Sequence, residues 1–503
     1  MEGASMLHSV PTTRATVGAF ADAEGRQARL FRPLSPRLVI GLLSLQACTF
    51  VILYELDGLP IEGRLSLSVF AGVLIAWVVL GLPDMPVALA GALALVVSGA
   101  VDEEALFATL GSEIIWLLIA AFVMASVMRS SGTAERLAAV ALTRCRTVSR
   151  MFWGATLVIA LTAFVIPSTS ARAAILMPVF FGLSSAIGRP SVTRGLALLF
   201  PSVILLSACA SLTGAGAHLI AADFMRRVSD TDIGFAHWAL LGGPFGFVTS
   251  LLACGLIQLL FLSAEDRRAA IGTLPVRHRS NSCSDATVLT IMGATVLLWA
   301  TNALHGQNIA VIALVGALLA ASKPVSGISL KEALKGVEWN LLLFLAATLL
   351  IGEALLTSGT ARYLVDQTLA ALGGHLSLAP WMVIAIAAVI SSLAHIVIMS
   401  RTARASVLIP AVALPLSAFA VDPSVLIFVT TIGSGFCQTL MVSAKPVLLF
   451  GSAEALTFTQ ADLLRLALFL LPLFVALLVA FSLFVWPLLG LPIETLSAMP
   501  AKA

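Results

Sequence analysis

Two short segments place hydroxyl groups and arginines inside otherwise apolar sequence. One reads STSARAAILMP from Ser168 to Pro178, and the other reads SRTARASVLIP from Ser400 to Pro410. They share the pattern S-x-[ST]-A-R-A-[AS]-x-L-[MI]-P at an offset of 232 residues, which is 400 minus 168. A charge within apolar, membrane-like sequence is costly, so such a residue usually faces a partner or a cavity. The repeated motif is therefore the first candidate for a functional site.

The arginines of the motif have two possible roles. Arg172 and Arg404 occupy the same motif position, where a planar guanidinium could hold a carboxylate or a sulfate through paired hydrogen bonds. Alternatively, each arginine could bind free carbonyl groups at a helix end and fix its own segment. Arg401 has no counterpart in the first copy, and this asymmetry favours contact with the substrate or a role as a fixed cation.

The hydroxyl residues of the motif stand where we expect helices to begin. They are Ser168, Thr169, Ser170, Ser400 and Thr402. The N-terminus of a helix presents free N–H groups and partial positive charge, which suit an anion. Serine and threonine also commonly cap helices without any ligand, and the two roles are compatible. We therefore include these residues, with the three arginines, in a predicted substrate site.

Four further polar residues lie in apolar runs outside the motifs. Lys445 could add positive charge to an anion site or neutralise a nearby acid, and we add it to the predicted substrate residues. His218 and His395 could exchange protons, although a lone histidine in such a run more often packs and forms hydrogen bonds. Glu353 could carry a proton or simply pair with an arginine.

The charges around the motifs favour an anionic substrate. Arg172, Arg401, Arg404 and Lys445 are cationic, and neither motif contains an acidic residue. An anion with two or more charges would offset this excess. A sodium/proton antiporter would instead be expected to carry a central aspartate, so we disfavour that class.

The composition predicts that the motifs lie in membrane-spanning helices. The chain has 503 residues, of which 59% are hydrophobic and 11% charged, with a mean hydropathy of +1.03. A soluble domain carries about 25% charged residues, so we expect an all-α, multi-pass membrane protein surrounded by lipid. The net charge of +3 and the lack of a basic run with aromatics argue against a nucleic-acid partner. The six cysteines show no metal-ligand spacing, and we expect no cofactor.

The apolar runs repeat in order between the two halves of the chain. In each half, one run holds the motif at its centre and predicts a re-entrant hairpin, with tips at 168–172 and 400–404. Pro167 supports a break in the helix at the first tip, because proline lacks a backbone N–H and restricts the residue before it. A second run follows, with a polar or glycine-rich interruption that predicts a broken helix, at 194–225 and 424–450. With three leading spans, these runs give about 11 transmembrane helices in an inverted-repeat transporter with two opposed hairpins.

The chain divides into six segments on this reading. We predict a disordered cytosolic tail (1–36), N-terminal scaffold helices (37–112, ending in an interfacial helix at 102–112), a first repeat (113–262), a cytosolic loop (263–285), a second, inverted repeat (286–490) and a C-terminal tail (491–503). Loop arginines and lysines place the N-terminus in the cytoplasm. The first hairpin would then open from the cytoplasm and the second from outside.

The motifs and their order resemble the divalent anion/sodium symporter family, whose members carry dicarboxylates, citrate or sulfate. That family belongs to a larger ion-transporter superfamily, which also includes arsenite and sodium/proton carriers. Its members carry a serine-asparagine-threonine motif at each hairpin tip, where this chain has Ser168-Thr169-Ser170 and Ser400-Arg401-Thr402. The resemblance extends over about residues 36–490 and includes the breaks at Gly214–His218 and Ser443–Pro446.

The resemblance implies a function and a mechanism. It implies secondary active transport of a small divalent anion, held between the hairpin tips and moved by an elevator-like slide of a dimeric carrier. It also implies possible sodium sites near Ser168, Gly214, Ser400 and Ser443. Here both tip asparagines are replaced, and Arg401 puts a permanent cation where a sodium ligand is expected. The coupling ion could therefore be sodium or a proton, or Arg401 could replace a sodium ion.

Other classes of protein remain as alternatives. An oxyanion exporter or a sodium-independent anion exchanger of the same superfamily would use the same architecture. A channel would show no saturation or counterflow. An intramembrane zinc protease requires H-E-x-x-H, which this chain lacks, whereas a serine enzyme could use His218 or His395 as its base. We expect a carrier and not an enzyme, located in a bacterial inner membrane.

Overall fold

The computed structural model describes residues 36–56, 58–132, 145–229, 231, 233–271, 282–371, 378–453 and 457–493, and nearly all of them are helical. Within this part, nine helices are long and apolar enough to cross a membrane, and six shorter apolar helices accompany them. The prediction of an all-α, multi-pass membrane protein is therefore confirmed, while the number of about 11 crossings stays a prediction. The predicted tail before residue 36, residues 272–281 of the predicted loop and most of the tail after residue 490 lie outside the described residues.

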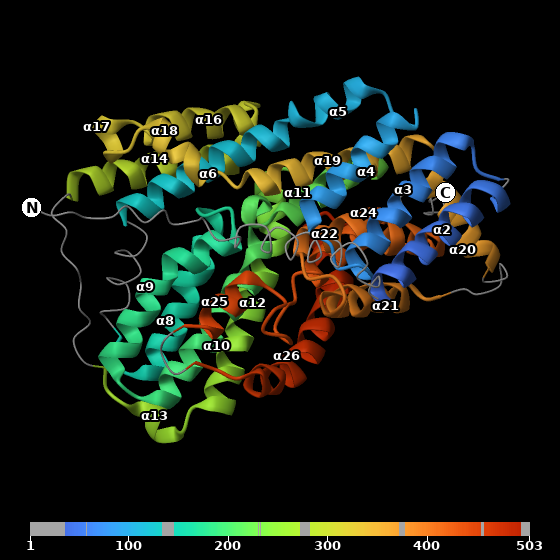
Figure 1. Ribbon diagram of the computed structural model, residues 1–503. Coiled ribbons are helices and arrows are strands. Elements are labelled where there is room, and N and C mark those ends of the chain that lie inside the picture. The colour runs from blue at the N-terminus through green and yellow to red at the C-terminus, as the bar shows by residue number, and fades with distance from the viewer. Residues whose placement is uncertain are drawn as a thin grey trace, which may run out of the picture.

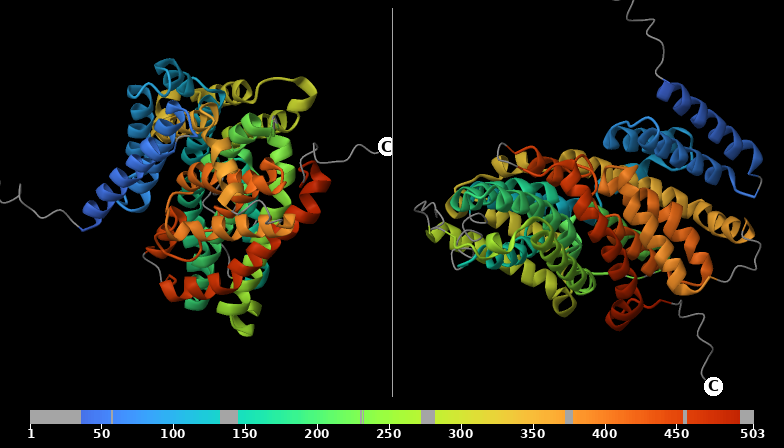
Figure 2. Two further views of the ribbon diagram at one scale, coloured as in Figure 1. Left: turned by 90° about the vertical axis from the view of Figure 1, so that its right-hand side faces the viewer. Right: turned by 90° about the horizontal axis from the view of Figure 1, so that it is seen from below.

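The N-terminal helices pack in chain order at one edge of the molecule. They are α2 (Pro36–Glu55), α3 (Ile61–Val78) and α4 (Asp84–Val97), and α4 packs on α19 (Trp339–Thr357). Figure 2 shows α2 at the outer edge of this group. The next helix is α5 (Glu103–Leu110), a short helix at the place where the sequence predicts one at 102–112.

A layer of helices from both halves lies along the upper side of Figure 1. In it, α6 (Glu113–Ser131) packs on α16 (Ile309–Ala320), which packs on α14 (Ser282–Ala300). The short helix α15 (Asn302–His305) joins α14 to α16, and the short helices α17 (Lys323–Ser326) and α18 (Leu330–Ala333) connect α16 to α19. Because α19 contacts α4 as well as α11 (Gly216–Ser229) and α22 (Arg401–Leu408), it lies at the border between this layer and the core.

The remaining helices form the core that carries both motifs. In the first half they are α8 (Val148–Leu161), α9 (Thr169–Ile187), α10 (Pro190–Leu206), α11 (Gly216–Ser229), α12 (Phe235–Phe261) and α13 (Ala264–Arg268). In the second half they are α20 (Thr360–Ala371), α21 (Pro380–Leu393), α22 (Arg401–Leu408), α23 (Leu414–Leu416), α24 (Pro423–Gly433), α25 (Lys445–Gly451) and α26 (Gln460–Ala480). Their inward side chains share one large buried apolar cluster.

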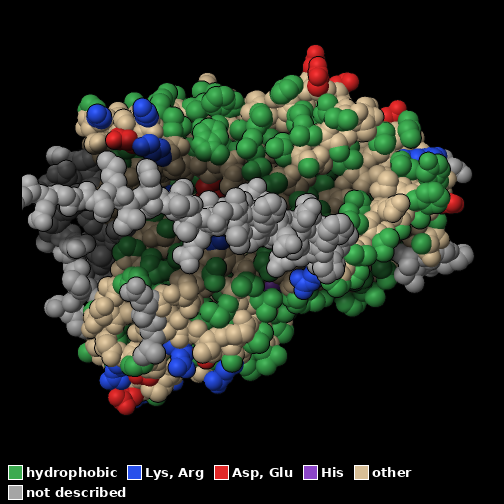
Figure 3. Space-filling model, viewed as in Figure 1, with side chains coloured by type: hydrophobic (Ala, Val, Ile, Leu, Met, Phe, Trp, Pro, Cys, Tyr) green, Lys and Arg blue, Asp and Glu red, His purple; other side chains and the backbone are tan. Residues whose placement is uncertain are grey.

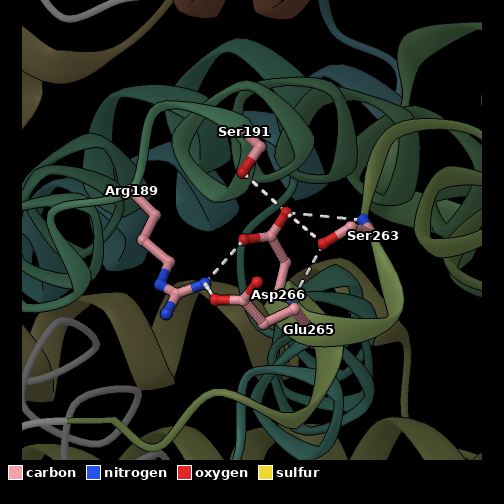
Figure 4. A network of polar contacts seen from close by, with 5 residues as sticks. All are labelled: Arg189, Ser191, Ser263, Glu265 and Asp266. Atoms are coloured by element: carbon pink, nitrogen blue, oxygen red, sulfur yellow. Dashed lines mark hydrogen bonds and ion pairs between the residues drawn. The ribbon is translucent and has the colours of Figure 1, made fainter.

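The helices α8 and α9 form a hairpin whose two ends meet at α13. The amide of Val148, where α8 begins, donates to the carbonyl of Ala269 at 3.1 Å. Arg189, just after α9, donates to Asp266 at 3.0 Å, and the Ser191 hydroxyl donates to the same carboxylate at 2.9 Å. Figure 4 shows this network, in which Asp266 points toward Arg189, Ser191 and Ser263. The start of α8 and the end of α9 therefore both lie beside α13, and the first motif forms the turn between the two helices.

The second motif has the same local structure as the first. A short 3-10 turn ends each preceding helix, at Thr162–Phe164 and at Ala394–Ile396, again 232 residues apart. Four residues of non-helical chain follow, and the next helix then begins directly after the motif serine. The sequence repeat is therefore a structural repeat. That either hairpin re-enters the membrane stays a prediction.

The prolines that close the two motifs have different effects on their helices. Pro178 lies inside α9, which continues to Ile187. Pro410 lies in a π-helical turn, Ile409–Ala413, that follows α22. Proline lacks an N–H group and its ring clashes with the carbonyl four residues earlier, so a wider turn is one way to accommodate it.

Both predicted broken helices are interrupted. Break 1 (207–215) separates α10 from α11 and consists of two short 3-10 turns, close to the interruption expected at 211–218. Break 2 (434–444) separates α24 from α25. It begins well before the predicted place at Ser443–Pro446, because the helix already ends at Gly433, so Lys445 starts the second half-helix instead of lying inside the break.

Candidate functional site

The first tip is held by a serine that forms two hydrogen bonds. The Ser168 hydroxyl accepts a hydrogen bond from the amide of Ala171 at 3.3 Å and so caps α9. The same hydroxyl donates to Oε1 of Glu338 at 2.8 Å, across 170 residues of sequence. Thr169 and Ser170 follow in the first turn of α9 and are half-buried. Ser400 caps α22 in the same way, accepting from Ala403 at 3.3 Å.

Arg172 is fully buried, and its guanidinium binds groups of the protein itself. Its Nε donates to the Thr162 hydroxyl at 2.9 Å, and Nη1 donates to the carbonyl of Ile204 at 2.8 Å. Its Nη2 donates to the carbonyl of Ile159 at 2.6 Å and to the Ser207 hydroxyl at 2.8 Å. Because these acceptors lie at the ends of α8 and α10, Arg172 ties the first tip to break 1.

Arg404 does the same for the second tip. Its Nε donates to the carbonyl of Ser434 at 3.0 Å, and Nη1 donates to the carbonyls of Ile398 at 2.7 Å and Met399 at 3.1 Å. Its Nη2 lies 2.7 Å from the sulfur of Cys437. These contacts favour the second of the two roles considered for the paired arginines, which is to bind free carbonyl groups and fix the tip.

Arg401 is the cation whose hydrogen bonds are incomplete. Its Nη2 lies 2.9 Å from Nε2 of His218, whereas Nε and Nη1 are buried and have no hydrogen-bond partner among the described residues. The guanidinium also lies against Gly435, where an added Cβ would be 2.6 Å from Nη2. A guanidinium has five N–H donors, and the neighbouring protein uses one. Unlike the paired arginines, this one has donors left for a ligand.

His218 is in the neutral form that this contact requires. A guanidinium can only donate, so Nε2 of His218 accepts and its Nδ1 carries the proton. Nδ1 then donates to the carbonyl of Ser211 in break 1 at 2.8 Å. The imidazole also packs on Trp238 of α12, with the ring centres 5.1 Å apart. The contact joins the second tip to α11 of the first half.

The start of α19 lies against the same group of residues. A Cβ added at Gly216 would be 3.3 Å from both Thr402 and Leu341, so these three residues meet where α11 begins. Glu338, which precedes α19, binds Ser168 as described above. The two tips, both breaks and the first turn of α19 are therefore linked by direct contacts.

Other predicted residues lie outside this group. Lys445 is exposed at the start of α25. His395 is buried and bonds to Ser392 and to the Thr439 hydroxyl. Glu353 pairs with Arg227 at 3.5 Å, which is the arginine-partner role considered for it.

The predicted sodium positions remain untested. Gly214 of break 1 must be a glycine, because an added Cβ would overlap the carbonyl oxygen of Ala208. The Ser443 hydroxyl donates to the carbonyl of Leu440 at 2.6 Å. In the described part of the chain, no group of three or more His, Cys, Asp or Glu residues could hold a metal ion.

Comparison with known proteins identifies the family. A model of the citrate transporter family, CitMHS, matches residues 72–433 and again residues 296–495. The chain belongs to the citrate transporter family. The resemblance to anion carriers of the ion-transporter superfamily is thus confirmed, and the protein is a membrane transporter.

Other proteins are similar to this chain in sequence or in fold. A membrane protein of Cupriavidus necator is 23% identical over 407 residues, covering 75% of this chain and 79% of the relative. The Alcanivorax borkumensis YdaH transporter has a similar fold, with a TM-score of 0.54 and 19% identity over 76% of this chain and 89% of the other. Neisseria gonorrhoeae MtrF, described as one of a class of antimetabolite efflux pumps, gives a TM-score of 0.52 and 13% identity over 75% and 82%.

The sequence prediction missed the residues that α19 contributes. Glu338 and Leu341 lie far from both motifs in sequence, and neither belongs to the repeated motif. One signal was present, because Glu338 is an acidic residue immediately before the apolar run that forms α19. An acid at the edge of a spanning helix is common, however, and only the fold shows which tip it contacts.

Proposed function

We propose that this member of the citrate transporter family is a secondary active carrier of a small anion with two or more charges. The dicarboxylate and citrate classes are our first candidates, with sulfate as the further class. The observation that carries the proposal is Arg401, whose Nε and Nη1 are buried and have no hydrogen-bond partner in the part of the chain that the structure describes. An unpaired buried charge is strongly destabilising, so a ligand carboxylate that accepts from these donors would complete the site.

The binding residues that we propose are centred on the second tip. Arg401 would hold a carboxylate, with the Thr402 hydroxyl beside it and His218 fixing the orientation of the guanidinium. Arg172 and Arg404 would hold the two tips in place without binding the anion, since their guanidinium groups donate to acceptors of the protein. Lys445 and the first-tip hydroxyls would contribute only if the ligand or the core moves.

We further propose that the core moves as one body against the outer helices, in an elevator-like cycle. The ties from Arg172 and Arg404 support this, because each holds a tip to the break of its own half. The outer body would contain α2 to α6 and α19, which pack on one another. We expect the carrier to act as a dimer in a bacterial inner membrane.

The distribution of basic residues supports the proposed orientation. Figure 3 shows Lys and Arg side chains at the upper left, over α17 and α18, and at the lower left, near α13. The sequence places Arg267 and Arg268 in α13, near the first hairpin, and Lys323 and Lys331 in the short helices after α16. Cytoplasmic loops are enriched in such residues, so we assign both of these segments to the cytoplasm, with the first hairpin opening from it.

Ligand binding by purified protein tests the proposal directly. Thermal unfolding would be followed with citrate, dicarboxylates and sulfate, because a ligand that binds the folded state raises the melting temperature. We expect at least one of these anions to stabilise the wild type. Arg401→Ala should abolish this shift, and Arg401→Lys should restore it only in part because lysine cannot form a planar fork.

The matched control is Arg146→Ala, which removes an exposed arginine outside the core. It should bind the anion like the wild type. Saturable uptake and counterflow of the same anion in liposomes would then establish a carrier. If Arg401→Ala binds the anion as well as the wild type does, the proposed site is wrong.

A further inference from the structure

The hydrogen bond between the first tip and α19 has a defined direction. The Ser168 hydroxyl has one proton, and its oxygen already accepts from the amide of Ala171 at 3.3 Å. Glu338 contributes a carboxylate oxygen at 2.8 Å, which as an ionised group can only accept. Ser168 therefore donates a hydrogen bond to Glu338. Because the acceptor is charged, this hydrogen bond is stronger than one between two neutral groups.

Glu338 thereby places a negative charge at the N-terminus of a long helix. α9 has 19 residues and begins directly after Ser168, so its first N–H groups and its dipole favour an anion there. The second tip has the opposite arrangement. There Arg401 has free donors, and its one polar contact at the guanidinium is a neutral histidine.

The residue that supplies this charge does not belong to either hairpin. Glu338 immediately precedes α19, which packs on α4 of the outer helices as well as on α11 and α22 of the core. Leu341, one turn later, lies beside Gly216 and Thr402. The carboxylate therefore reaches the first tip from the border of the core, next to the residues that surround Arg401.

We propose that Glu338 acts as a tethered competitor of the substrate at the first tip. In the empty carrier its carboxylate takes the anion position at Ser168 and holds the tip to α19. A substrate anion that binds Arg401 and reaches the first tip must displace it. Displacement frees the core from α19, so the loaded carrier moves more readily than the empty one. The inference rests on the proposed function and adds to it that exchange of substrate is faster than net transport.

The test compares exchange with net flux in liposomes that contain citrate, or whichever carboxylate binds the wild type. We expect the wild type to exchange labelled for unlabelled anion several-fold faster than it releases anion into empty buffer. Glu338→Gln keeps the size of the side chain but loses its charge. It should raise the rate of net flux to about the rate of exchange. It should also lower the anion concentration that gives half-maximal transport by about threefold to tenfold.

A double substitution shows whether the contact itself is responsible. Once Ser168→Ala has removed the hydroxyl, Glu338→Gln should have little further effect, because residues in direct contact are not additive. Glu104→Gln, an exposed carboxylate on α5, is the matched control and should behave like the wild type. Thermal unfolding of each purified variant would confirm that it is folded.

The outcomes separate this inference from the proposed function. If the wild type neither binds nor transports any of the anions, the proposed function fails. If it transports, but Glu338→Gln leaves the ratio of exchange to net flux unchanged, the competitor role is wrong. The same conclusion follows if Glu338→Gln retains its full effect in the Ser168→Ala background.

Discussion

Three arginines of the two motifs share a residue type and differ in what they bind. Arg172 and Arg404 donate to carbonyl, hydroxyl and sulfur acceptors of their own half. Arg401 donates to one neutral histidine and keeps two nitrogens unbonded. A buried polar group without a partner costs free energy that a paired group does not. The first two arginines should therefore stabilise the folded protein. Arg401 should destabilise the empty protein but provide donors for a ligand.

Substituting these arginines should affect stability in opposite ways. Arg172→Met leaves the carbonyls of Ile159 and Ile204 without their donors, so we expect it to lower the unfolding free energy by about 2–5 kcal/mol. Arg401→Met removes a buried charge with unsatisfied donors, so the melting temperature of the empty protein should stay the same or rise. Thermal unfolding of the two purified variants without ligand checks this. Equal destabilisation of both variants would contradict the distinction.

The sequence could identify this group of residues but could not divide it by role. The repeated motif is visible because its spacing and composition are local, and in both copies a helix begins directly after the motif serine. Whether an arginine finds hydrogen-bond acceptors depends on helix ends that lie tens of residues away in the sequence, as for Arg172 and Ile204. Glu338 was missed for the same reason, since its partner Ser168 is 170 residues distant.

At the scale of elements, the first hairpin is held at its two ends by α13. Burial alone would raise the pKa of Asp266, but hydrogen bonds from Arg189, Ser191 and Ser263 outweigh it and hold this pKa below its usual value. The unfolded chain therefore binds a proton more readily than the folded one at this carboxyl. The resulting stabilisation is present above the unfolded pKa of about 3.9 and is lost as the pH falls through the folded pKa.

This network predicts a pH-dependent effect of Asp266→Asn. The variant should melt below the wild type at about neutral pH, and the difference should shrink as the pH falls below about 4, where the wild-type carboxyl also becomes protonated. Thermal unfolding across this pH range measures the difference. Glu265→Gln is the control, because Glu265 is exposed and its ion pair with Arg189 should add little. A difference that grows toward acid would contradict the assignment.

Element boundaries show a second limit of sequence reasoning. The sequence predicts the interruption of the second broken helix at Ser443–Pro446, but α24 already ends at Gly433. Proline is tolerated at the start of a helix, and Pro446 lies there in α25. The glycines at 433 and 435 were the better signal. Gly433 could carry no side chain, because a Cβ would overlap the Ser391 hydroxyl.

At the scale of the whole molecule, the surroundings of the two related tips differ in charge. The first tip contacts the carboxylate of Glu338, and the second carries Arg401. A cation at the second tip would repel a sodium ion there and could replace it. The architecture is therefore repeated, while the electrostatics of the two tips are not.

We expect transport to depend only weakly on sodium. Uptake of a bound anion into liposomes should proceed at similar rates when sodium is replaced by choline, because Arg401 already supplies the positive charge at the second tip. Uptake measured against sodium concentration checks this. A steep, sigmoidal rise with sodium would show that the ion still binds and that Arg401 does not replace it.

The bond between His218 and Arg401 also has a consequence for biosynthesis. Its partners are 183 residues apart and lie in different halves of the chain. The ribosome finishes the first half long before residue 401 is made, so the broken helix of that half must wait in the bilayer with a buried histidine that lacks its partner. Insertion of the second hairpin completes both halves at once. A chain truncated before it should therefore be recognised as incomplete by membrane quality control, even though every helix of its first half has been inserted.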